Sequence, residues 1–257
     1  PVKMPEGEAR SDFDFTTDLA RRLEAKGIET RKFFPWKTKT EFNEFLLGDE
    51  IDWVSFKRNG WAPFKFELGN FAVHGFPTPS GKIELWSEML ESIDVDPLPA
   101  YAPTRMENVD KETRKAYPMI LITGAREKTY HHSRYRDQAW ARKVSPFPLL
   151  QVHPHDGSML GLSDGDWISI ETPNGSGACK LKVKISKETD VGTVRTGMGW
   201  WLPEAPGPTH GALDVNVNVA LSYDGPWDPV TGSADTRGLP CRITPVSENE
   251  IPMRASA

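Results

Sequence analysis

The sequence predicts a mainly β fold preceded by a mixed α/β part, in a chain of 257 residues. Three observations carry this prediction. Helical periodicity is confined to the first hundred residues, a proline-bearing stretch without periodicity follows, and from Tyr117 onward short β runs are separated by Gly, Pro and Asp. Many short strands at this spacing are typical of a barrel or sandwich rather than an open α/β sheet.

Two helices are predicted in the first part from their caps and periodicity. Ser11 is a suitable N-cap, and an apolar residue recurs every four positions over 15–23 until Gly27 interrupts the pattern. Thr40 is predicted to open a second, shorter helix that ends at Gly48. Neither helix carries a catalytic group on its polar face, so both are interpreted as packing elements.

The stretch from about 92 to 118 is predicted to be the domain boundary, because it combines prolines and charges with little periodicity. The predicted organisation is a partial α/β segment at 1–100, a connector at 101–116, a β domain at 117–246 and a C-terminal tail at 247–257.

The strands of the second half are predicted from their apolar patterns. The runs 119–123 and 149–153 are apolar enough for buried strands, whereas 166–172 alternates as a half-buried strand does. The stretch 180–185 also alternates and places its lysines on one face. That face is interpreted as solvated, because the chain has a net charge of −5 and is not expected to bind nucleic acid.

Composition excludes several other classes of protein and site. No apolar run approaches the roughly 18 residues of a membrane span. Cys179 and Cys241 cannot supply the thiolates of an iron–sulfur cluster and are predicted to be buried thiols, with a disulfide as the alternative. The start, Pro1 to Pro5, resembles neither an initiator sequence nor a signal peptide, so the chain is expected to be part of a longer protein. The compartment, periplasm or cytoplasm, is left open.

The densest group of chemistry-bearing residues follows the first buried strand. Thr123 and Gly124 allow the backbone to turn sharply and point N–H groups outward, which is one way to hold an anion. The candidate partners of a phosphate are Arg126, Arg134 and Arg136, with His132 and Ser133 as hydrogen-bonding groups. The alternative is a polar surface loop with solvated arginines.

Other chemistries find weaker support. A zinc site at His131, His132, His153 and His155 lacks an evident third ligand of another type. A hydrolase using Ser133 lacks the glycine-flanked nucleophile turn, and no phosphate-binding glycine motif is present. Farther on, Trp200 and Trp201 between glycines can form a wall against a flat heterocycle, although core packing is the alternative for each.

In this order the blocks resemble the C-terminal region of the molybdopterin oxidoreductases of the dimethyl sulfoxide reductase family. The residues that carry the resemblance are Glu6 to Asp12, Leu19 to Leu23, Thr78 to Glu84, Leu121 to Arg126, His132-Ser133, His153 to Asp156, Leu160 to Asp166, Trp200-Trp201, Asn218, Asp228 to Gly232 and Cys241 to Ile243. The His-Ser and Gly-Trp-Trp details are most similar to the branch holding thiosulfate and polysulfide reductases, acetylene hydratase and pyrogallol transhydroxylase.

The resemblance implies a double-psi β-barrel like that of aspartate decarboxylase, which covers a bis(molybdopterin guanine dinucleotide) cofactor. It implies that Thr123, Gly124, Arg126, His132, Ser133 and Asn218 line this cofactor, and residue type adds Arg134 and Trp200. One departure is Ala125, which displaces Arg126 by one position relative to several relatives.

The resemblance also implies which parts lie elsewhere. The ligand of molybdenum or tungsten and any iron–sulfur cysteines are expected upstream, so no catalytic or metal-binding residue is assigned and the isolated chain is expected to be inactive. Expected partners are the upstream domains and an iron–sulfur electron-transfer subunit. The alternative function is a self-contained β-barrel binding module without a cofactor.

Overall fold

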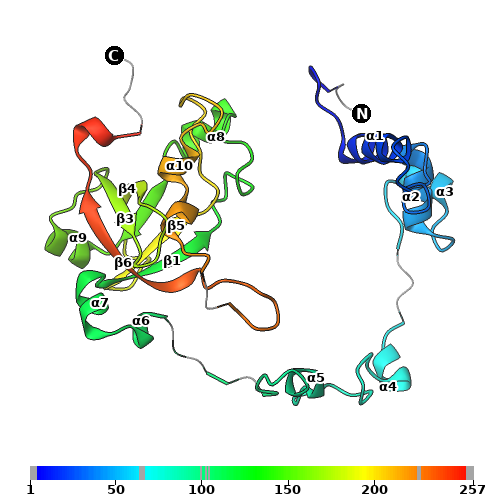
Figure 1. Cartoon of the computed structure of the whole chain (residues 1–257), viewed down its shortest axis with the longest axis horizontal. Helices are drawn as coiled ribbons and strands as arrows, with labels where there is room; N and C mark the ends of the chain where they lie inside the picture. Colours follow the sequence, from blue (N-terminus) through cyan, green and yellow to red (C-terminus); the bar gives the residue numbers. More distant parts are fainter. Residues whose placement is uncertain are drawn as a thin grey trace. The chain divides into compact units, whose positions relative to one another are not determined.

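A computed structural model describes residues 5–63, 67–98, 100–101, 103, 105–224 and 227–252. The chain divides into two compact units, Pro1–Ile83 and Glu84–Ala257, which are described separately (Figure 1). In the described part of the chain, no helix is long and apolar enough to cross a membrane.

The first unit is helical. Its helices are α1 (Asp12–Glu24), α2 (Lys39–Leu47), α3 (Trp53–Asn59) and α4 (Asn70–His74). The predicted cap of α1 is confirmed, because the Ser11 hydroxyl accepts a hydrogen bond from the Asp14 backbone N–H at 3.2 Å. The predicted start of α2 at Thr40 is wrong: Thr38 caps the helix by accepting from the Glu41 N–H, and Gly48 ends it as predicted.

The second unit contains a closed six-stranded barrel with the strand order β1-β5-β2-β4-β3-β6 (Figure 1). The strands are β1 (Met119–Ala125), β2 (Leu149–Val152), β3 (Trp167–Glu171), β4 (Cys179–Ile185), β5 (Thr193–Gly197) and β6 (Arg237–Pro245). Two neighbouring pairs, β1 with β5 and β2 with β4, are parallel, and the other pairs are antiparallel. The predicted β-barrel is confirmed.

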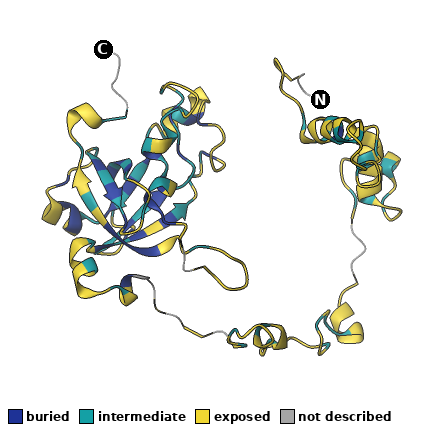
Figure 2. Ribbon diagram, viewed as in Figure 1, coloured by how far each residue is buried: buried dark blue, intermediate teal, exposed yellow. Residues whose placement is uncertain are grey.

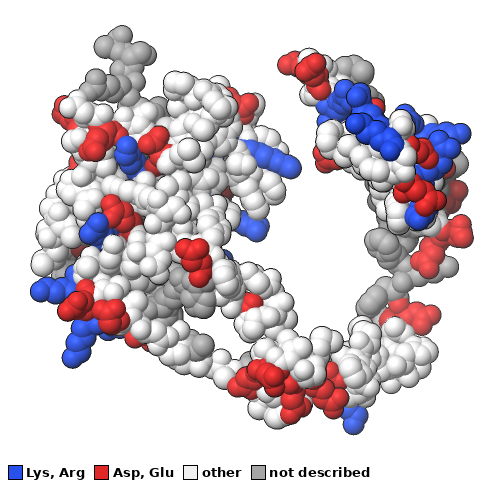
Figure 3. Space-filling model, in the orientation of Figure 1, with Lys and Arg blue, Asp and Glu red and all other residues white. Residues whose placement is uncertain are grey.

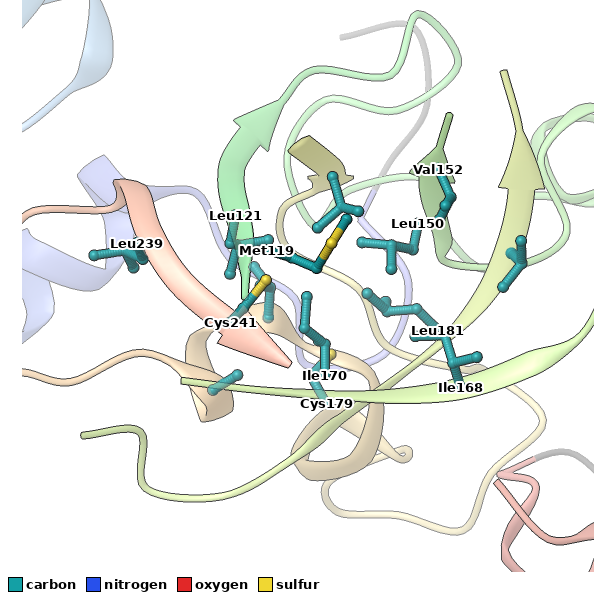
Figure 4. Close-up of a cluster of buried hydrophobic side chains, with 14 of the residues drawn as sticks. Met119, Leu121, Leu150, Val152, Ile168, Ile170, Cys179, Leu181, Leu239 and Cys241 are labelled. Carbon is teal, nitrogen blue, oxygen red and sulfur yellow. The ribbon is translucent and has the colours of Figure 1, made fainter. Parts of the chain in front are cut away.

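Alternating apolar side chains fill the barrel. Buried and half-buried residues alternate along β3, as the sequence predicted, and Ile168 and Ile170 are fully enclosed. Figure 4 shows these side chains together with Leu121 and Leu150 in one cluster, and Figure 2 shows buried residues along the strands. The prediction of buried, unpaired thiols is confirmed, and burial raises the pKa of Cys241 to about 12.

The second unit also contains short helices. They are α5 (Glu88–Glu91), α6 (Arg105–Asn108), α7 (Lys111–Ala116), α8 (Ala139–Val144), α9 (Pro154–Leu160) and α10 (Ala212–Val215), with 3-10 helices η1 (Val217–Ala220) and η2 (Glu248–Glu250). The stretch 101–116, predicted as a connector, holds α6 and α7, and α6 contacts β6.

Candidate functional site

The site begins with a break in β1. The register of β1 against β5 shifts between Ile122 and Ala125, and Gly124 lies in the left-handed region at a φ of 80°. Thr123 is buried, and its hydroxyl donates to the Thr236 carbonyl at 2.5 Å. The predicted Thr-Gly bend is therefore an irregularity within β1, which continues to Ala125, and not a sharp turn at the end of the strand. The Thr123 side chain joins this bend to the segment before β6.

Two segments far apart in the sequence meet beyond this bend. We call residues 123–136 the crossover loop and residues 197–201 the glycine–tryptophan turn. The Trp201 indole N–H donates to the Ser133 carbonyl at 2.8 Å. A Cβ on Gly199 would lie 3.0 Å from the Ser133 backbone nitrogen, so only glycine permits this approach. The structure thus brings together the two segments that the sequence singled out.

Arg136, the last residue of the crossover loop, contacts the glycine–tryptophan turn and is 1% exposed. Its guanidinium carbon lies 3.9 Å from the centroid of the Tyr130 ring and 3.6 Å from that of Trp200. The phosphate contact suggested for Arg136 from the sequence is therefore wrong, because the guanidinium group is enclosed by rings. Nothing in the spacing of Arg126, Arg134 and Arg136 distinguishes the buried arginine from the exposed ones.

Trp200 shows the packing role that the sequence left open. It is 1% exposed and shares a small apolar cluster with Tyr130, Ala141, Leu202 and Val215. Its cofactor contact stays a prediction that this burial does not favour. Trp201 is half-buried, so more of its surface is open.

Glu127 lies within the same contact, a position that the sequence reading did not single out. Its carboxylate accepts from the Trp200 indole at 2.7 Å and lies 3.9 Å from Arg136 Nη1. Burial raises the pKa of Glu127, whereas Arg136, Trp200 and Ser145 oppose that rise.

Four predicted site residues of the crossover loop have exposed side chains. They are Arg126, His132, Ser133 and Arg134. Arg126 and His132 border one small cavity of about 10 Å³ with Glu127 and Arg136. Within the part of the chain that the structure describes, neither Arg126 nor Arg134 has a side-chain hydrogen bond or ion pair. Their guanidinium groups are thus available to an anion.

Asn218 lies on η1 and is exposed. Its backbone N–H donates to the Asn216 side chain at 3.1 Å, and its own amide has no hydrogen bond to any described residue. Val215 just before it belongs to the cluster around Trp200, whereas Val217 belongs to the barrel core. Asn218 is therefore anchored where these two clusters adjoin, with a free amide.

The alternative chemistries find no assembled site among the described residues. No group of three or more His, Cys, Asp or Glu side chains is close enough to hold a metal ion. His153 instead caps α9, since its Nδ1 accepts from the His155 backbone N–H at 3.1 Å. The Ser133 hydroxyl has no histidine partner in the described ranges, as a hydrolase would need.

A hollow of about 570 Å³ in the second unit lies elsewhere. It is lined from α6 and α7 to Thr172 and Leu239, and it includes none of the predicted site residues. We therefore place the candidate site by its exposed donors and not by this cavity. The distribution of charge favours the same choice, because the exposed Arg and Lys side chains of the crossover loop are Arg126, Lys128 and Arg134, and its one acidic residue, Glu127, is half-buried. Acidic side chains gather around α5 instead (Figure 3).

Known proteins are similar to this chain over the region that includes the crossover loop and the glycine–tryptophan turn. Residues 119–240 match the model of the family described as the molydopterin dinucleotide binding domain. Acetylene hydratase of Syntrophotalea acetylenica is 35% identical over 247 residues, which cover 92% of this chain and 33% of that protein. Dopamine dehydroxylase of Eggerthella lenta is 29% identical over 182 residues, which cover 69% of this chain and 18% of that protein.

Two further matches extend the comparison. Dimethyl sulfoxide reductase DmsA of Escherichia coli is 26% identical over 244 residues, covering 84% of this chain and 29% of that protein. The solved structure of acetylene hydratase from Pelobacter acetylenicus superposes with a TM-score of 0.82 at 32% identity, covering 95% of this chain and 34% of that one. The chain thus spans about a third or less of the length of these relatives.

Proposed function

The chain belongs, through residues 119–240, to the molydopterin dinucleotide-binding domain family, and from that premise we propose that the crossover loop and the glycine–tryptophan turn hold a molybdopterin guanine dinucleotide. Its homologues include acetylene hydratase, dopamine dehydroxylase and members of the dimethyl sulfoxide reductase family. The observation that carries the proposal is the contact of Ser133 with Trp201, which joins the two segments into one surface.

The side chains on this surface fit a phosphorylated heterocycle. Arg126 and Arg134 are exposed in a chain of net charge −5, and planar guanidinium groups bind phosphate through paired hydrogen bonds. His132 and Ser133 add exposed hydrogen-bonding groups. These residues bind and orient the dinucleotide, and the positive charge of the two arginines offsets the negative charge of the phosphates.

Asn218 is proposed to bind a ring edge. A primary amide carries donors and an acceptor, which match the alternating polar atoms of a pterin or a guanine. The amide is exposed and not engaged by other described residues. Gly124 is proposed to contribute through its left-handed backbone, which makes β1 irregular just before the crossover loop leaves the strand.

We further propose that the chain is the C-terminal part of a molybdenum or tungsten enzyme and is inactive alone. It spans 33% of acetylene hydratase, and both of its cysteines are buried in the barrel core, where they cannot ligate a metal or cluster. When bound, the cofactor supplies the metal centre at which substrate reacts. The metal ligand and any iron–sulfur cluster then belong to upstream domains, and an iron–sulfur subunit is a possible electron-transfer partner.

The apolar surface of the first unit supports upstream domains as its partner. Phe33, Trp61 and Leu68 are 71%, 66% and 91% exposed, respectively. Exposed apolar side chains of this size fit a surface that another part of the protein covers when they form one patch. We propose that the preceding part of the same polypeptide covers these residues.

The test is to express the chain with its upstream region in a host that makes the cofactor. Bound pterin is quantified by fluorescence after oxidation, and molybdenum and tungsten by mass spectrometry. The double variant Arg126→Ala/Arg134→Ala should retain at least tenfold less pterin, because each lost charge-assisted hydrogen bond is worth about 1.5–3 kcal/mol.

Arg242→Ala is the matched control, because this arginine pairs with Glu171 on the barrel and outside the proposed site. It should retain pterin like the unchanged protein. A folded, mature protein without pterin would contradict the proposal and favour a barrel module that needs no cofactor. If the double variant and the control retain equal amounts of pterin, Arg126 and Arg134 do not bind the cofactor.

A further inference from the structure

Arg136 is a buried cation in an otherwise exposed stretch. The residues from His131 to Tyr135 are exposed, yet Arg136 is 1% exposed. Its Nε and Nη1 have no hydrogen-bond partner among the described residues. The guanidinium plane is held instead by Tyr130 and Trp200, whose rings meet edge to face at 5.4 Å between centroids. Burying a charge in this way is costly, so its contacts need a structural reason.

The remaining nitrogen of Arg136 joins the two segments of the site. Nη2 donates to the His132 carbonyl at 3.2 Å and to the Met198 carbonyl at 3.1 Å. One carbonyl belongs to the crossover loop and the other to the glycine–tryptophan turn. Glu127 completes the group, because it lies near Nη1 and accepts from Trp200.

The stretch beside Arg136 has a backbone that needs support. His132 and Tyr135 have φ values of 56° and 69°, in the left-handed region that residues with a Cβ rarely adopt. Such conformations persist where surrounding contacts over-determine them. The bond from Arg136 to the His132 carbonyl is such a contact, and it acts at one of the two strained residues.

We propose that Arg136 is a positioning residue that locks the 131–134 turn onto the glycine–tryptophan turn and so presents His132, Ser133 and Arg134 to the ligand. The presentation to a ligand rests on the proposed function, whereas the locking does not. Lysine should not replace arginine here, because an ammonium group cannot both lie against two rings that meet edge to face and reach two carbonyls.

The test uses hydrogen exchange of indole N–H groups in the full chain, followed by NMR. The Trp201 indole reports docking through its bond to Ser133, and the backbone amides of β1 and β5 report the barrel. In Arg136→Lys, and in Arg136→Met/Glu127→Gln, which also neutralises the carboxylate, Trp201 exchange should accelerate about tenfold or more while the barrel amides remain protected. Arg242→Met is the control and should change neither.

Unchanged Trp201 exchange in both variants would overturn the proposal. Equal acceleration of the barrel amides, or loss of folding in both variants, would also overturn it, since Arg136 would then stabilise the whole unit. A second arm measures pterin in the cofactor-bearing enzyme, where Arg136→Lys should lose at least as much as Arg134→Ala alone. Absence of pterin from the unchanged enzyme would refute the proposed function but leave the exchange result standing.

Discussion

The barrel and the first unit have similar local sequence patterns, but their apolar side chains are buried to different extents. Both contain helices with hydrogen-bonded caps, and in both the apolar residues recur at regular spacing. In the barrel, Leu150 and Val152 of the short strand β2 are fully enclosed, whereas Phe15 and Leu19 of the longer helix α1 are 60% and 44% exposed. Caps and periodicity thus suffice to form a helix, but burial requires a second surface.

The first unit has an apolar nucleus of aromatic rings. Phe13, Phe34, Trp36, Phe42 and Phe45 contact one another in a chain with centroid distances from 4.7 to 6.1 Å. However, Thr17 is the only residue of α1 that is fully buried, and α2, α3 and α4 have none. The first unit is therefore less self-sufficient than the barrel.

The largest expected difference between the regions comes from one substitution made in each. Leu150→Ala removes a fully buried side chain and should destabilise the barrel by about 3 kcal/mol, because it leaves a cavity. Leu46→Ala on α2 removes a side chain that is 63% exposed and should cost less than about 0.5 kcal/mol. Hydrogen exchange measured by mass spectrometry follows both regions separately. Equal destabilisation by the two substitutions would contradict the difference in burial between the barrel and the first unit.

An intermediate effect is expected from pH. Burial raises the pKa of Glu127 above its ordinary value of 4.5, so the unfolded chain loses this proton first as pH rises. Stability from the protonated form is complete below pH 4.5 and is lost as pH rises through the raised pKa. Relative to Glu127→Gln, the unchanged chain should lose stability to urea as pH rises above 4.5. Parallel profiles would show that the carboxyl is not buried in this way.

The smallest effect on the barrel is expected from Phe15→Ser/Leu19→Ser. Both side chains are largely exposed on α1, so the protection of barrel amides should change by less than about 0.5 kcal/mol. Binding of a dye that detects apolar surface should fall in the same variant. A clear loss of barrel protection would show that the first unit supports the barrel directly.

The sequence predicted some of the secondary-structure elements and missed others. The strands β1, β2, β3 and β4 lie where apolar runs and alternation predicted them. The strand β5 was not predicted, since its run of five residues includes Arg195 and is too short to show a pattern. The helix α9 was also missed, because His153, Pro154 and His155 read as a metal motif, whereas they form a cap and a first turn.

At the candidate site, residue types identified the place but not the role of each side chain. Thr123 and Gly124 were recognisable as an irregular position, because glycine permits a left-handed backbone, but β1 continues through them to Ala125. Arg126, Arg134 and Arg136 were equivalent in the sequence, yet the structure exposes two and buries the third. Glu127 and Tyr130 had no sequence signal, since their partners Trp200 and Arg136 become neighbours only after folding.

The sequence by itself determined the caps, the alternation and the glycine-bent turn, and through its ordered motifs it identified the family. These features depend on residues close together in the chain, where backbone geometry and side-chain period act directly. Tertiary structure alone decided that residues 132–133 meet 198–201, and that Arg136 is enclosed between Tyr130 and Trp200. Contacts between residues about 65 positions apart follow from barrel closure, which no local pattern encodes.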